Sequence, residues 1–89
     1  DIYSLGAMLY ELATGKLPFD GESPVSIAVK QINEEPIPPR EINPDIPVGL
    51  EHIILCAMSK KPGDRFQSAD SMLEYVKNLQ KNKKISKPI

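Results

Sequence analysis

The side chains best suited to chemistry in this 89-residue sequence are its one cysteine, its one histidine and the arginine of the turn KKPGDRF. Cys56 follows His52 by four residues, a spacing that places both on one face of a helix. A nucleophilic pair of this kind needs a third group to orient the histidine, and none is apparent. The two residues are also too few for an intramolecular disulfide or a structural zinc site. We therefore predict that neither is catalytic.

Arg65 is the stronger candidate for a functional role. It lies beside Phe66, between the apolar ends of two expected helices, so its guanidinium should be drawn partly out of water. A buried guanidinium needs a planar carboxylate partner that matches its fork of donors. Asp64 is adjacent but poorly aimed, and we expect the partner to come from elsewhere. The alternative is an ordinary surface arginine after a turn.

The sequence shows no phosphate-binding or metal-binding pattern. Its five glycines never approach the spacing of a phosphate-cradling loop. The neighbouring carboxylates Glu34 and Glu35 lie in a proline-rich stretch and are most simply solvated. We predict no catalytic residue, no metal ligand and no cofactor site in this chain.

The elements that must position these residues are four helices, because periodicity gives no convincing strand. The first runs from about residue 1 to 13 and ends at Gly15, which suits a left-handed C-cap. Ser23 with Pro24, Pro47, and Ser68 mark the starts of the other three. The fold class is therefore predicted to be all-α.

The first helix is apolar all round and should be buried on every side as the central helix. The other three should cover it, although short amphipathic stripes are unlikely to cover it completely. The connection at residues 34–47 contains five of the nine prolines and is expected to be stiff and non-helical. The expected covering residues are Val25, Ala28, Val29 and Ile32, then Leu50, Ile53, Ile54, Ala57 and Met58, then Met72, Leu73, Val76 and Leu79. We therefore expect a further part of a larger domain to pack on the first helix.

Composition and charge exclude several classes of protein. The chain is 40% hydrophobic and 26% charged, which is typical of a globular protein, and no apolar run is long enough to cross a membrane. A single cysteine fits reducing cytoplasm. The net charge of -1 hides an asymmetry, because residues 77–89 hold five lysines and no acid, whereas residues 1–76 hold six basic and twelve acidic side chains. We divide the chain into a folded part, 1–82, and a basic tail or linker, 83–89, which the resemblance described below makes a juxtamembrane segment.

Two stretches, DIYSLGAMLYELATGKLPF and KKPGDRFQSADSML, together resemble the C-terminal lobe of eukaryotic-like protein kinases. The stretch GESPVSIAVKQINEEPIPP is similar to bacterial receptor-type Ser/Thr kinases that carry PASTA repeats. The resemblance implies that Asp1 and Gly6 open the buried central helix as structural anchors, with Asp1 accepting hydrogen bonds from the catalytic loop. It also implies that Arg65 pairs with the glutamate of an upstream Ala-Pro-Glu motif.

The resemblance further implies that the second helix docks protein substrates or regulators, with Lys30 and Gln31 facing outward from it. It assigns ATP and Mg²⁺ to the parent kinase, since the glycine-rich loop, the catalytic base and the metal ligands would precede residue 1. The chain alone is therefore predicted to be inactive. The parent would be cytoplasmic, with a membrane anchor following the tail.

Two other classes of protein are also compatible with a small helical chain. A helix-turn-helix nucleic-acid reader is disfavoured, because the link between the last two helices is too long and Asp70 and Glu74 would face phosphates with the wrong sign. A stand-alone helical interaction or regulatory module remains the alternative. If the first helix lacks its cover on the side of Ile2, Leu5 and Leu9, the isolated chain should self-associate or else be partly molten as a monomer.

Overall fold

The computed structural model describes residues 1–81, and these form five α-helices, one 3-10 turn and no strand. The helices are α1 (Ile2–Thr14), α2 (Pro24–Asn33), α3 (Pro39–Ile42), α4 (Val48–Ala57) and α5 (Ala69–Lys81), with the 3-10 turn η1 at Pro62–Asp64. The predicted all-α class and all four predicted helices are confirmed. The predicted tail at 83–89 lies outside the described residues.

The helix ends follow from local sequence. Gly15 ends α1 with φ of 79°, a left-handed conformation that costs glycine little, and its N–H bonds the carbonyl of Glu11. Ser23 caps α2 and exchanges hydrogen bonds with Ser26 in a capping box, while Pro24 occupies the first turn. These local signals are why the predicted ends of both helices agree with the structure.

The proline-rich connection was predicted to be non-helical, and this prediction was wrong in part. Residues Pro39–Ile42 form the single-turn helix α3, because proline at the first helical position has a suitable φ and loses no hydrogen bond there. Pro39 and Ile46 are buried, so the connection contributes to the core. Asn43 Nδ2 donates to the carbonyl of Ala13 at 3.1 Å and so fixes this segment to the end of α1.

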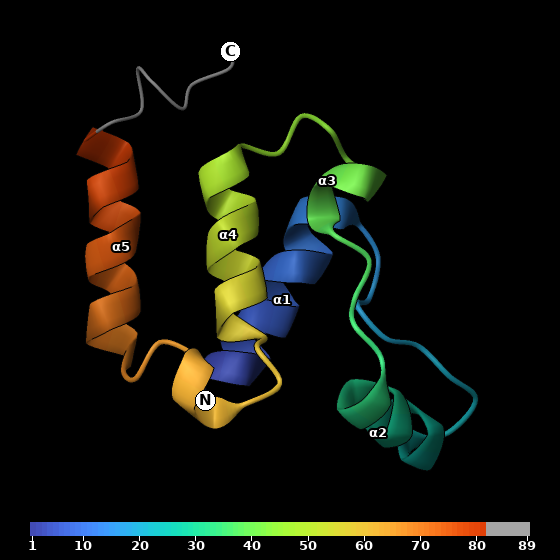
Figure 1. Ribbon diagram of the computed structural model, residues 1–89. Coiled ribbons are helices and arrows are strands. Elements are labelled where there is room, and N and C mark those ends of the chain that lie inside the picture. The colour runs from blue at the N-terminus through green and yellow to red at the C-terminus, as the bar shows by residue number, and fades with distance from the viewer. Residues whose placement is uncertain (82–89) are drawn as a thin grey trace.

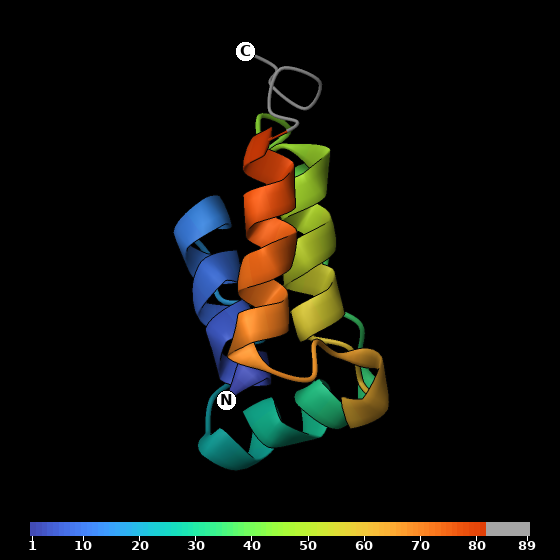
Figure 2. The same ribbon diagram turned by 90° about the vertical axis from the view of Figure 1, so that its left-hand side faces the viewer.

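Helix α1 packs mainly against α4, with α3 across its far end and α5 beside α4 (Figure 1). One core cluster contains Tyr10, Phe19, Ile54 and Met58, and the other contains Ile53, Ala57 and Met72. The turned view shows α2 crossing below the α1, α4 and α5 layer instead of joining it (Figure 2). The predicted inner face of α4 is confirmed.

Helix α1 was predicted to be buried on every side, and in this structure it is not. Helices α4 and α5 cover only part of its circumference. Met8 is 52% exposed and Leu12 is 74% exposed. The prediction of which side of α1 lacks cover, namely the side of Ile2, Leu5 and Leu9, was also wrong in part. Ile2, Leu5 and Leu9 pack against the second core cluster, although Ile2 and Leu5 also line a groove of about 570 Å³ with Met8.

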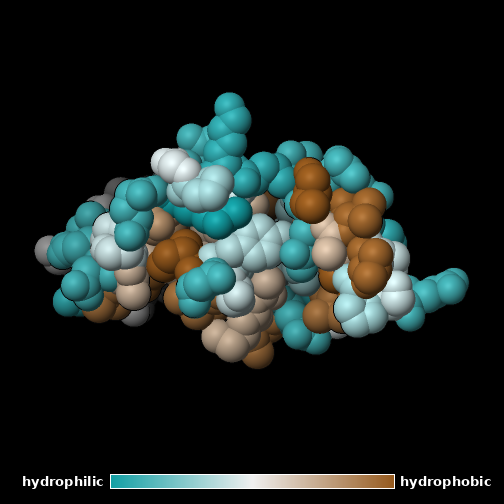
Figure 3. Space-filling view, turned by 90° about the horizontal axis from the view of Figure 1, so that it is seen from below, coloured by the Kyte–Doolittle hydropathy of each residue, from teal (hydrophilic) through white to brown (hydrophobic). Residues whose placement is uncertain are grey.

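The predicted orientation of α2 was wrong. Val25, Val29 and Ile32 are 72%, 49% and 74% exposed, and α2 has no buried residue. Ile27, on another side of the helix, packs against the first core cluster instead. Apolar side chains consequently gather on the surface at the α2 end of the molecule (Figure 3).

Candidate functional site

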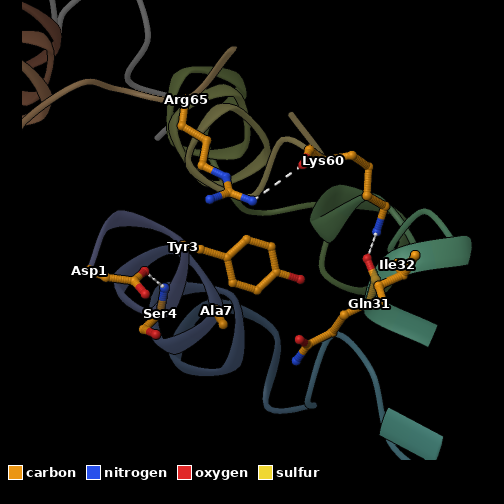
Figure 4. Close-up of a pocket in the computed structure, with 8 residues that line it drawn as sticks. All are labelled: Asp1, Tyr3, Ser4, Ala7, Gln31, Ile32, Lys60 and Arg65. Carbon is orange, nitrogen blue, oxygen red and sulfur yellow. Dashed lines mark hydrogen bonds between the residues drawn. The ribbon is translucent and has the colours of Figure 1, made fainter. Parts of the chain in front are cut away.

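The best candidate site is a pocket of about 590 Å³ between the start of α1, the last turn of α2 and the turn after α4 (Figure 4). Because its walls come from three separate segments, the pocket exists only in the folded chain. It is lined by Asp1, Tyr3, Ser4, Ala7, Gln31, Ile32, Lys60 and Arg65.

Asp1 forms one end of the pocket and caps α1. Its Oδ1 accepts a hydrogen bond from the backbone N–H of Ser4 at 2.9 Å. This bond satisfies one of the free N–H groups at the helix start and places a negative charge near the positive end of the helix dipole. The role implied by resemblance, anchoring a catalytic loop, involves groups outside this chain and stays a prediction.

Arg65 forms the roof of the pocket. Its Nε donates to the carbonyl of Ser59 at 2.8 Å, and one terminal nitrogen lies 3.4 Å from the carbonyl of Lys60. The guanidinium carbon lies 5.0 Å from the centre of the Tyr3 ring, which is a cation–π arrangement. Arg65 is half-buried, as predicted, and among the described residues no carboxylate pairs with it.

Tyr3 forms the floor of the pocket, and sequence reasoning had given it no role of its own. Its hydroxyl oxygen is buried and has no hydrogen-bond partner in the described part of the chain. Burial raises the pKa of the Tyr3 hydroxyl, and the nearby Arg65 charge lowers it to a smaller extent. The hydroxyl therefore stays protonated at neutral pH.

Lys60 closes the side of the pocket nearest α2, and it too was missed. Its Nζ donates to the carbonyl of Gln31 at 2.6 Å and lies 4.7 Å from the centre of the Phe19 ring. Lys60, Arg65 and Asp1 give the lining a formal charge of +1. No single motif spans these residues, so only the fold reveals their proximity.

The structure brings some predicted site residues together and separates others. Asp1, Gln31 and Arg65 line the pocket, whereas Gly6 lies one turn farther along α1 against α4. Lys30 does not line the pocket with Gln31, because it is half-buried and its ammonium donates to the carbonyl of Asp20. Gln31 thus lines the pocket and Lys30 contacts the loop before α2, and the docking role expected of both residues stays a prediction.

The histidine and cysteine of α4 make separate contacts. His52 stacks on Tyr75 of α5 with ring centres 5.5 Å apart, while Cys56 Sγ lies 3.6 Å from the carbonyl of Asp64. Within residues 1–81, no group of three potential metal-ligating side chains was found, and no helix is both long and apolar enough to cross a membrane.

Comparison with known proteins gives consistent relatives, although no family model matches the chain. It is 49% identical over 82 residues to a probable serine/threonine-protein kinase of Clostridium acetobutylicum and covers 12% of that protein. It is 47% identical over 72 residues to the serine/threonine-protein kinase PknB of Mycobacterium leprae, and 47% identical over 77 residues to PrkC of Bacillus subtilis. These matches cover 81% and 86% of this chain and 12% of each relative.

The chain thus corresponds to one segment of the bacterial serine/threonine-protein kinases that it matches. It spans about an eighth of the length of the curated relatives that it matches. The resemblance seen in the sequence is confirmed, and the helical fold agrees with a segment of the kinase C-terminal lobe.

Proposed function

We propose that this chain is the helical scaffold that completes the large lobe of a serine/threonine-protein kinase. The parent protein would transfer the γ-phosphoryl group of ATP to serine or threonine side chains of proteins. This activity is carried over from the relatives, which are described as serine/threonine-protein kinases. The scaffold itself would position other parts of the domain and contact no reacting atom.

The proposal rests mainly on the partial burial of the Arg65 guanidinium and on its contact with Tyr3. A guanidinium that is half removed from water, and lies on an aromatic ring, is expected to have an anionic partner. None of the described carboxylates fills that role. We infer that the pocket receives a carboxylate from another part of the parent, namely the glutamate of the Ala-Pro-Glu motif that the resemblance implies.

The uncovered side of α1 supports the same proposal. Met8 and Leu12 are exposed on a helix whose opposite side is packed against α4, and the neighbouring groove is lined mainly by apolar side chains. A surface of this kind stabilises a protein when another apolar surface covers it. In the parent, we propose that the upstream part of the lobe provides this cover.

ATP and Mg²⁺ do not fit the residues of this chain. Its glycines lack the spacing of a phosphate-binding loop, and no metal-ligating cluster was found among the described residues. We therefore assign both to the parent and propose that the 89-residue chain is inactive alone. The resemblance to receptor-type kinases extends the proposal to a parent anchored in the membrane after the basic tail.

We also propose that α2 is a docking surface for protein substrates or regulators. The surface consists of the exposed side chains Val25, Val29 and Ile32, with Gln31 and the half-buried Lys30 at its edge. Exposed apolar residues on one helix are a feature of interaction sites.

To test the scaffold proposal, the complete open reading frame that encodes this chain is expressed, and phosphorylation of a generic Ser/Thr substrate is assayed. We expect activity in the wild type and a loss of stability of about 3–5 kcal/mol in Arg65→Ala, as for a stranded buried carboxylate. Lys61→Ala, which removes an exposed positive charge from the same turn, should behave as wild type. A complete protein that transfers no phosphate, or an Arg65→Ala variant within about 0.5 kcal/mol of wild type, would contradict the proposal.

The second candidate is a stand-alone helical interaction module. It is favoured by one observation, namely that the chain forms two buried core clusters of its own. This candidate predicts a monomeric 89-residue chain that unfolds cooperatively, whereas the scaffold proposal predicts self-association.

A further inference from the structure

Helix α2 is attached to the rest of the chain by few interactions. It has no buried residue, and three of its apolar side chains, Val25, Val29 and Ile32, face solvent. Ile27 packs against the first core cluster, and the ammonium of Lys30 bonds within the preceding loop, to the carbonyl of Asp20. Among the described residues, one further hydrogen bond joins α2 to a later part of the chain: Lys60 Nζ donates to the carbonyl of Gln31.

The Lys60 ammonium is well placed to hold this helix. The carbonyl of Gln31 belongs to the last turn of α2, where carbonyls have no partner within the helix and the helix dipole is negative. The ammonium donates to this carbonyl at 2.6 Å. A positive charge at this end of a helix is stabilising both as a hydrogen-bond donor and through the dipole.

The same ammonium also contacts the segment that leads into α2. It lies 4.7 Å from the centre of the ring of Phe19, a residue that is 8% exposed and belongs to the first core cluster. One charged group thus touches the core residue before α2 and the last turn of α2. It joins the last turn of α2 to the loop that precedes this helix.

Lys60 is in turn held by the pocket. Arg65 donates to the carbonyls of Ser59 and Lys60, and its guanidinium lies over Tyr3 at the start of α1. Figure 4 shows the resulting sequence of contacts, from Tyr3 through Arg65 and Lys60 to Gln31. The side of the pocket formed by α2 therefore depends on the position of Lys60.

We propose that Lys60 is the positioning residue that fixes α2 against the body of the domain, and that it thereby sets both the α2 surface and one wall of the pocket. These contacts lie within this chain, so the role of Lys60 can be tested without kinase activity in the parent.

The test measures amide hydrogen exchange of the full 89-residue chain, residue by residue, in wild type and three variants. Lys60→Met keeps an apolar stem of similar length but removes the charge and the donor. We expect amides in the second half of α2 to exchange at least about tenfold faster in this variant, because local opening is held back by few other contacts. Amides of the buried residues Ile53 and Ile54 in α4 should exchange within about twofold of wild type.

Two matched variants separate positioning from general stability. Lys60→Arg retains a cation and donors and should restore protection of α2 to within about threefold of wild type. Lys61→Met removes the neighbouring exposed charge and should leave α2 unchanged. The proposal is overturned if Lys60→Met exchanges like Lys61→Met in α2, if α4 is accelerated as much as α2, or if Lys60→Arg is as unprotected as Lys60→Met.

Discussion

Gly6 of α1 lies directly against Ala57 of α4, so closely that a methyl group added at Gly6 would come 2.8 Å from the Ala57 Cβ. The same methyl group would come 3.0 Å from Cγ of Met58. Ala57 Cβ is attached to the backbone of a helix and cannot turn away. Contact between the two helices therefore requires glycine at this position, which gives the predicted anchor a physical basis.

Gly6→Ala should destabilise the chain. Overpacking costs about 1–3 kcal/mol, whereas alanine gains at most about 1 kcal/mol over glycine in helix propensity. At the middle of these ranges we expect a net loss of about 1 kcal/mol in the free energy of unfolding, measured with urea. Gly63→Ala is the control, since nothing lies within 4 Å of its added methyl group. A Gly6→Ala variant as stable as wild type would show that α1 and α4 can move apart at this contact without loss of stability.

Tyr10→Phe should loosen the proline-rich connection. The Tyr10 hydroxyl donates to the carbonyl of Ile37 at 2.5 Å, across 27 residues of sequence. Its loss should lower the free energy of unfolding by about 1 kcal/mol. Tyr75→Phe, at a tyrosine that is 38% exposed, should change it by less than about 0.5 kcal/mol. Equal effects of the two variants would argue against a specific role for the bond.

How far the sequence predicted the fold depends on how local the signals were. Capping and periodicity located α1, α2, α4 and α5, because those signals act within one or two helical turns. The orientation of α2 could not be predicted in the same way. Its apolar face was assumed to point inward, but Ile27 alone packs on the core while Val25 and Ile32 remain exposed.

The candidate site was predictable only in part for a related reason. The partial burial of Arg65 follows from its neighbours in sequence, and the structure confirms it. The role of Tyr3 depends on its contact with Arg65, about 60 residues away in sequence, and that of Lys60 on its contact with Gln31, about 30 residues away. No periodic pattern encodes such a contact, and an isolated tyrosine or lysine gives no signal of it.

Raising the pH should destabilise the chain through Tyr3. Burial raises the pKa of its hydroxyl above the ordinary value of 10.0, so the folded state holds this proton more tightly than the unfolded state. The stabilising contribution is complete below pH 10 and is lost as the pH rises through the folded-state pKa. Tyr10, whose pKa is raised by burial and by Glu41, acts in the same direction.

Tyr3→Phe separates this effect from other alkaline changes. At neutral pH the variant should be within about 0.5 kcal/mol of wild type or more stable, because the hydroxyl that it removes has no partner. Above pH 10 it should lose less stability than wild type in parallel urea titrations. Identical alkaline losses in both proteins would exclude Tyr3 as the source.

Self-association of the chain should depend on the uncovered side of α1. Burial of Met8 and Leu12 between copies would recover apolar contact at about 25 cal/mol per Å². In light scattering coupled to chromatography, we expect wild type to form larger species and Met8→Lys/Leu12→Lys to be mainly monomeric. Glu11→Gln, on the same helix and exposed, should associate as wild type. A wild type that stays monomeric at high concentration would favour the stand-alone module.

The central claim is that this chain is a kinase scaffold without a nucleotide site of its own. Calorimetric titration of ATP·Mg²⁺ into the purified 89-residue chain tests it most directly, after circular dichroism has shown that the chain is helical under the same conditions. We expect no saturable heat, because the sequence has no phosphate-binding loop and the described residues have no metal-ligating cluster. Saturable binding with a Kd on the order of micromolar, worth about 8 kcal/mol, would contradict it.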